Sequence, residues 1–186
     1  QIWAVISKPE EEFWLNLKSL VTSETRVRLC KIVWGGLGRD VYFVTNRWAA
    51  DAKAQTERWL CKKLGVYFPT VILSANKGRI AKGLVGDMPG PHFAIDDRFS
   101  NARSMAPHME SYLLNRPHNL SEVYNNRVES LEEFLDLIGT HVPGEYVGPK
   151  GGPQAELREG NSRVSKFFVT IESGSTTEES PFKVAS

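Results

Sequence analysis

The chain has 186 residues, which is enough for one ordinary domain and short for two. Hydrophobic residues make up 41% and charged residues 24%, a balance typical of globular proteins that excludes a wholly disordered or fibrous chain. Lys and Arg number 23 against 22 Asp and Glu, so the net charge of +1 gives no global reason to expect nucleic acid or an anionic membrane as partner. The two cysteines, Cys30 and Cys61, are too few for a disulfide scaffold and fit a reducing compartment.

No apolar run approaches the roughly 18–20 residues that cross a bilayer. No signal peptide opens the chain, because Lys8, Pro9 and three glutamates follow a short apolar-rich start. We therefore expect a cytoplasmic protein without membrane contact. Since the first residue is Gln1 rather than Met, we also expect that the chain is processed or begins inside a longer product.

Strands and helices alternate over the first 138 residues. Before the first strand, the apolar residues between Phe13 and Leu20 predict a loop and a helix that packs on the sheet. Runs rich in β-branched and aromatic residues predict strands over 41–45, 70–74, 92–95 and 111–114. Between them, helical patterns predict helices over about 50–64 and 78–85 and a helical stretch near 100–108.

The last helix has the clearest boundaries. Ser130 and Glu133 form a capping box, and Gly139 is expected to end the helix. Its apolar face consists of Leu131, Phe134, Leu135 and Ile138. Because the strands are apolar on both faces, we expect an α/β domain over 1–138, with a Rossmann-like, mostly parallel sheet and helices on both faces.

Residues 139–186 differ in composition from the rest of the chain. They hold 7 of the 15 Gly and 4 of the 10 Pro and end in a Ser-, Thr- and Glu-rich stretch. We interpret them as a Gly/Pro-rich tail, partly extended or disordered, with one strand over 166–171. Such tails often become ordered against a partner, so a protein partner for the tail is expected.

Polar residues follow three of the predicted strands. Thr45 and Asn46 follow the first, Lys77 lies just past the second, and Asp96 and Asp97 end the third. The carboxyl ends of parallel strands share one edge of the sheet, where ligands bind. A hydroxyl with neighbouring backbone amides and an ammonium suit a phosphate, and a carboxylate pair suits Mg²⁺. We therefore expect Thr45, Asn46 and Lys77 to bind phosphate and Asp96 and Asp97 to bind the metal.

Each of these residues also has a structural interpretation. Thr45 could cap the following helix, and Lys77 could be a solvated lysine, with Lys82 a rival for its role. Because successive strand residues point to opposite faces, only one of the two aspartates need face the ligand. Arg47 and Trp48 follow at the same edge and could contact the base or sugar of a substrate, although Trp48 could equally pack in the core.

Three segments together resemble motifs of the haloacid dehalogenase superfamily. Val41-Tyr-Phe-Val-Thr-Asn-Arg47, Lys77-Gly78 and Phe93-Ala-Ile-Asp-Asp-Arg98 are similar to its second, third and fourth motifs, with most similarity to 5′-nucleotidase-like phosphatases, including phage-type ones. The resemblance spans roughly residues 10–138. It implies a Rossmann-like sheet, a phosphoryl group bound by Thr45 and Lys77, and Mg²⁺ bound by Asp96 or Asp97.

The chain departs from this family at the first motif, a strand ending in Asp-x-Asp whose first Asp attacks phosphorus. No Asp precedes Asp40, and no Asp-x-Asp occurs in the sequence. We expect either that the chain starts downstream of that strand or that catalysis has been lost, so that no phospho-aspartate forms on this chain alone. A missing central strand would leave a gap in the sheet, which the strand at 166–171 would fill unless it pairs with a partner's edge.

Two functions therefore stay open. The first is a Mg²⁺-dependent phosphatase of the haloacid dehalogenase type, a hydrolase whose nucleophile is missing from this chain, acting on a phosphorylated small molecule, a nucleotide or a nucleic-acid end. The second is a catalytically inactive protein of the same fold that binds ligands or belongs to a larger assembly. A plain dinucleotide binder would need a glycine-rich turn after the first strand, which the sequence lacks.

Overall fold

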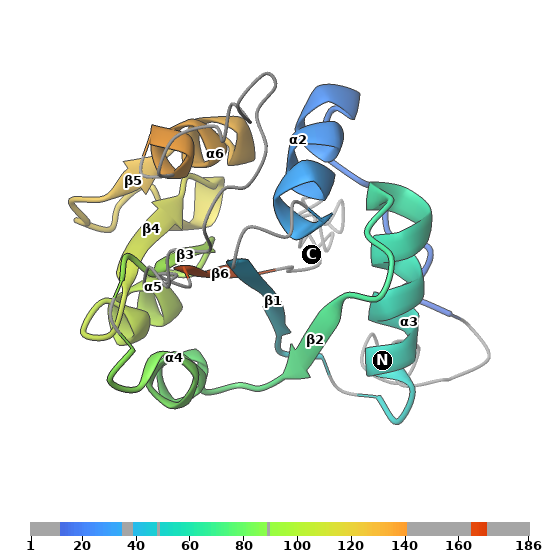
Figure 1. Cartoon of the computed structure of the whole chain (residues 1–186), viewed down its shortest axis with the longest axis horizontal. Coiled ribbons are helices and arrows are strands. Elements are labelled where there is room, and N and C mark those ends of the chain that lie inside the picture. The colour runs from blue at the N-terminus through green and yellow to red at the C-terminus, as the bar shows by residue number, and fades with distance from the viewer. Residues whose placement is uncertain (1–11, 35–38, 48, 89, 141–164, 171–186) are drawn as a thin grey trace, which may run out of the picture.

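The protein is an α/β structure built on one parallel sheet (Figure 1). The computed structural model describes residues 12–34, 39–47, 49–88, 90–140 and 165–170. Six strands form the sheet in the order β2-β1-β6-β3-β4-β5. The strands are β1 (Arg39–Thr45), β2 (Thr70–Leu73), β3 (Phe93–Asp96), β4 (Glu110–Leu114), β5 (Arg127–Val128) and β6 (Ser165–Thr170).

Helices connect the strands and cover them. They are α2 (Ser23–Trp34), α3 (Ala52–Trp59), α4 (Lys77–Val85), α5 (Phe99–Met105) and α6 (Leu131–Thr140). The helix α3 continues into a π-helical turn, η2 (Leu60–Leu64), and a 3₁₀ turn, η3 (Pro117–Asn119), follows β4. Every strand predicted from the apolar runs is present, and all strand pairs are parallel, as expected.

A strand from the C-terminal region lies inside the sheet. β6 pairs with β1 on one side and with β3 on the other, so it separates these two strands. Val169 is level with Phe43 of β1 and Ile95 of β3, and its side chain is buried. The strand expected over 166–171 is therefore an inner strand of this sheet, while the rest of the predicted tail, 141–164 and 171–186, lies outside the described residues.

The sheet has an apolar core on each face. Side chains of successive strand residues alternate between faces, so Phe43 and Val44 belong to different clusters. The larger cluster joins the strands to α2, η2 and α6 through Leu29, Leu60 and Phe134. The smaller cluster joins Val44 and Ala94 to α4 and α5 through Ala81, Val85 and Met105. Helices therefore cover both faces, as the sequence predicted.

The helix ends agree with the sequence signals, with two corrections. The helix predicted over 50–64 ends at Gly65, which adopts φ 73° as a left-handed cap. Ser130 Oγ accepts from Glu133 N as in a capping box, but Glu133 reaches back to the amide of Glu129. The predicted end of α6 at Gly139 is wrong, because the helix continues to Thr140.

The N-terminal region differs more from expectation. Trp14 and Leu15 are buried, and Gln55 Oε1 accepts from both of their amides. Leu20 is 81% exposed, so it lies outside the core, and the helix of this region begins only at Ser23. Among the described residues, every helix is too short or too polar to cross a bilayer.

Candidate functional site

A buried ion pair at the carboxyl edge of the sheet joins Lys77 to Asp96. Lys77 Nζ lies 2.9 Å from Asp96 Oδ2, and both side chains are at most 1% exposed. Asp96 is the last residue of β3, and Lys77 is the first residue of α4, directly after β2. The interpretation of Lys77 as a solvated lysine is therefore wrong, whereas Lys82, farther along the same helix, is exposed.

The second carboxylate oxygen of Asp96 is held by the start of α5. Oδ1 accepts from the backbone amide of Arg98 at 2.8 Å and from Asn101 Nδ2 at 3.1 Å. Both oxygens of this carboxylate thus bind protein donors. Three donors, one of them an ammonium, compensate for the loss of hydration on burial.

Asp97 has a different environment from its neighbour. Its side chain is half-buried, and its backbone carbonyl accepts from Asn119 Nδ2 at 2.6 Å and from His118 Nε2 at 3.0 Å. Asn119 is itself buried, and it also donates to the carbonyl of Leu114 at the end of β4. The turn η3 therefore fixes the backbone that carries Asp97.

Thr45 ends β1 at the same edge of the sheet. It is buried, and its carbonyl accepts from the amide of Ser74, which follows β2. β6 separates β1 from β3, so the ends of these two strands lie about 10 Å apart, at twice the usual strand spacing. Asn46 follows as an exposed residue. The fold thus brings Lys77 and Asp96 into contact and places Thr45 along the same edge.

Arg47 is bound by the protein itself. Its guanidinium donates to Thr56 Oγ1 at 2.7 Å and stacks over the ring of Trp14, with Cζ 4.7 Å from the ring centre. Arg47 is 5% exposed, so in this structure its role is to join the N-terminal segment to α3 rather than to face a substrate. Trp48, the other predicted substrate contact, lies outside the described residues.

A magnesium ion at this edge would have to be held by a carboxylate of the predicted pair together with water. Mg²⁺ in proteins is commonly held by one or two carboxylates together with water and substrate oxygens. Of the predicted pair, Asp96 binds an ammonium and two N–H donors. In the described part of the chain, no group of three His, Cys, Asp or Glu side chains gathers as a ready-made metal cage.

Two residues that support this edge were not predicted. Asn101 lies in the first turn of α5, and its position five residues after Asp96 is the only signal that could have found it. Asn119 contacts both the carbonyl of Asp97 and Arg127 Nη2, which approaches Oδ1 at 2.9 Å. Asn119 also accepts from the backbone amide of Arg116, three residues earlier, so its local signal is the end of the turn η3, whereas its contact with Asp97 spans 22 residues.

Comparisons of the chain with protein-family models, with curated proteins and with solved structures find no match. The resemblance to haloacid dehalogenases therefore depends on the three motifs alone.

Proposed function

We propose that the carboxyl edge of this sheet binds a phosphate group together with Mg²⁺, as in a phosphatase of the haloacid dehalogenase type with a Rossmann-like sheet. The contact between Lys77 Nζ and Asp96 Oδ2 carries the proposal, because it joins the segments that resemble the third and fourth motifs. Thr45, in the segment that resembles the second motif, ends β1 at the same edge. The ligand would be a phosphorylated small molecule or a nucleotide.

Each residue has a distinct role in this proposal. The Thr45 hydroxyl and the backbone at Asn46 bind phosphate oxygens, and Lys77 supplies the positive charge. An ammonium has three donors, so Lys77 could keep its bond to Asp96 while it binds a phosphate. Because Lys77 is 1% exposed, such binding requires this edge of the sheet to open. Asp97 binds Mg²⁺, which would neutralise the phosphate charge. Asp96 holds Lys77 in place and acts as a positioning residue.

This chain has no attacking Asp at the place where the resembling family has one. In the resembling family, the strand between those of the second and fourth motifs ends in the attacking Asp. Here that position is occupied by β6, whose residues Ser165–Thr170 include no carboxylate. We therefore expect no phospho-aspartate on this strand.

The same observation favours a second candidate function. A protein with this edge but without the nucleophile would bind a phosphorylated ligand without hydrolysing it, as a catalytically inactive component of a larger assembly. The two candidates share the binding site and differ only in turnover, so one set of measurements separates them.

The test combines calorimetry with a phosphate-release assay on the purified chain. Inorganic phosphate is titrated with and without Mg²⁺, and Asp97→Asn is compared with Asp87→Asn, which makes the same change at an exposed residue after α4. We expect Mg²⁺-dependent binding that Asp97→Asn abolishes and Asp87→Asn keeps, with no phosphate released from a nucleoside monophosphate.

The other outcomes are equally informative. Mg²⁺-dependent phosphate release would support the phosphatase and refute the missing nucleophile. Absence of phosphate binding with Mg²⁺ present would overturn both candidates.

A further inference from the structure

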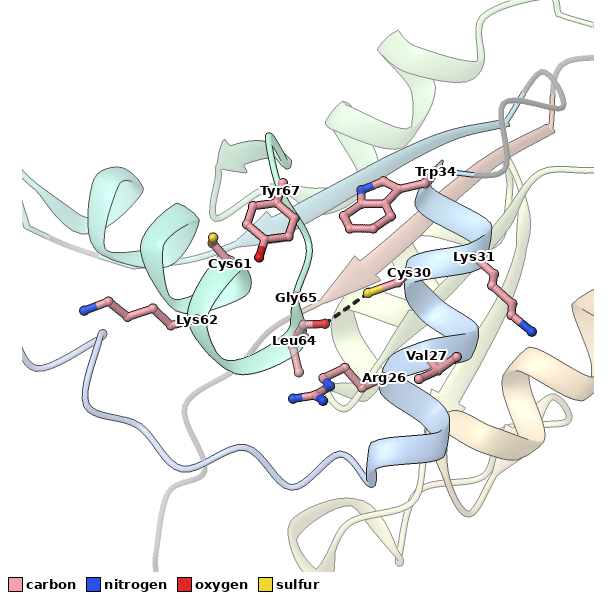
Figure 2. A pocket seen from close by; sticks show the side chains of 10 residues that line it. All are labelled: Arg26, Val27, Cys30, Lys31, Trp34, Cys61, Lys62, Leu64, Gly65 and Tyr67. Atoms are coloured by element: carbon pink, nitrogen blue, oxygen red, sulfur yellow. Dashed lines mark hydrogen bonds between the residues drawn. The ribbon is translucent and has the colours of Figure 1, made fainter.

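An open groove of about 810 Å³ lies between α2 and η2, on the sheet face covered by α2 (Figure 2). One wall consists of α2 residues at helical spacing, and the other consists of η2 and the segment that leads to β2. None of the residues assigned to the phosphate site line it.

The charged residues that line the groove are all positive. Arg26, Lys31 and Lys62 line it, and none of its lining residues in the described part of the chain is acidic. The whole chain carries a net charge of only +1, so three cations without an acid are a local excess. Figure 2 shows the Arg26 side chain between α2 and η2, whereas Lys31 and Lys62 lie on the outer sides of the two walls with their ammonium groups directed away from the groove. Such a surface attracts a polyanion.

The upper end of the groove in Figure 2 carries a pair of exposed aromatic rings. Trp34 ends α2 and Tyr67 follows η2, and their rings stack with centroids 5.5 Å apart and planes at 26°. These side chains remain 55% and 53% exposed. A stacked pair that leaves this much ring surface in water presents a flat platform to a ligand.

The next residue, Phe68, lines a neighbouring hollow together with Asp40 and Thr70 rather than this groove. Phe68 has φ 53°, a left-handed conformation that is costly for a bulky side chain. Its ring is 99% exposed, so packing against the described residues does not repay this strain.

We propose that this groove binds single-stranded nucleic acid. Unpaired bases would stack on the platform of Trp34 and Tyr67, and Arg26, Lys31 and Lys62 would neutralise the phosphates. Proteins that bind single strands combine a cationic groove with aromatic rings in this way. An acidic peptide would match the charge but would leave the exposed rings without a stacking partner. The inference depends on the groove alone and is independent of the phosphate site.

The experiment measures fluorescence anisotropy of a labelled oligothymidylate of about 12 nucleotides, a length that covers one such binding site. If three cations contact phosphates, a plot of the logarithm of the association constant against the logarithm of the salt concentration should have a slope of about −2. Arg26→Ala should reduce the size of that slope by about 0.7. Trp34→Ala should weaken binding at least about fivefold, since losing one base stack has effects of this order.

Controls separate the groove from general charge. Arg103→Glu changes an exposed arginine on α5, across the sheet, and should leave the affinity within about twofold of wild type, because only local phosphate contacts carry the binding. Circular dichroism confirms that the variants are folded. Absence of binding at low salt, wild-type affinity in Trp34→Ala, or displacement of the oligonucleotide by polyglutamate at equal charge would each overturn the proposal.

Discussion

Lys77 and Asp96 form an ion pair that is closed off from solvent, with Nζ and Oδ2 2.9 Å apart and neither side chain more than 1% exposed. The pair joins the start of α4 to the end of β3, and Asn101 connects it to α5. A buried pair of this kind is weak evidence for stability, because desolvation opposes the Coulomb attraction. Its position at the carboxyl edge of the sheet is what connects it to the proposed phosphate site.

Removing one partner of the pair should be strongly destabilising. Lys77→Met leaves a buried carboxylate without its cation and should lower the free energy of unfolding by about 3–5 kcal/mol in urea denaturation. The matched control is Lys82→Met on the exposed side of the same helix, for which a change within about 0.5 kcal/mol is expected. Equal effects of the two substitutions would show that the pair is not formed.

The close approach of α4 to α5 leads to a second prediction, about glycine substitutions in α4. A Cβ on Gly78 would lie 2.5 Å from the carbonyl oxygen of Ser104, whereas a Cβ on Gly83 of the same helix would meet nothing within 4 Å. Gly78→Ala should therefore lower the melting temperature, because the backbone must move. Gly83→Ala should raise the stability by roughly 0.5–1 kcal/mol through helix propensity. A neutral Gly78→Ala would contradict the observed packing of the two helices.

The position of β6 can be tested by hydrogen exchange. A strand paired on both sides has its amides in ladder bonds, so the peptide containing Val169 should exchange about as slowly as the peptide from β3. The intact chain is labelled and then digested, and mass spectrometry of the peptides gives both exchange rates in one experiment. Exchange of the β6 peptide at the rate of a solvated coil would rule out the sheet order described above.

The contribution of Glu132 to stability should be lost at acid pH. A hydrogen bond from the Thr25 hydroxyl is the largest cause that lowers the pKa of this carboxyl, with Thr22 contributing as well. Because the folded pKa is below the ordinary value, the contribution is present near pH 7 and is lost as pH falls through the lowered value.

The measurement compares wild type with Glu132→Gln in urea at several pH values. The difference should be at most about 1 kcal/mol near neutrality, because the group is partly exposed, and should vanish in acid. Thr25→Val removes the main cause of the shift and should flatten the same pH dependence. A stability difference between wild type and Glu132→Gln that grows as the pH falls would contradict this prediction.

Much of the fold could be predicted because its signals are local. The apolar runs at β1, β2, β3 and β4 are flanked by helical patterns, and parallel pairing follows from strands that are apolar on both faces. Local signals did not specify the place of β6; that it could fill a gap in the sheet was expected only from the family resemblance, beside the alternative of pairing with a partner's edge. Its neighbours, β1 and β3, are separated from it by long stretches of chain, and a short apolar run does not specify its partners.

The site shows the same division between local and distant signals. Lys77 and Asp96 could be predicted to share an edge, since each follows a strand of a parallel sheet. That Asp96 binds Lys77 depends on the starts of α4 and α5, which are known only from the structure. The burial of Arg47 against Trp14 was missed because the segment around Trp14 has no clear periodicity.

The central claim, a shared phosphate and magnesium site at the carboxyl edge, is tested most directly by a crystal structure of the chain soaked with Mg²⁺ and a phosphate mimic. The account predicts density for the anion within hydrogen-bond distance of Lys77 Nζ or the Thr45 hydroxyl, and density for the cation beside the Asp97 carboxylate. Clear density for both ligands at any other place on the molecule, with this edge unchanged, would contradict it.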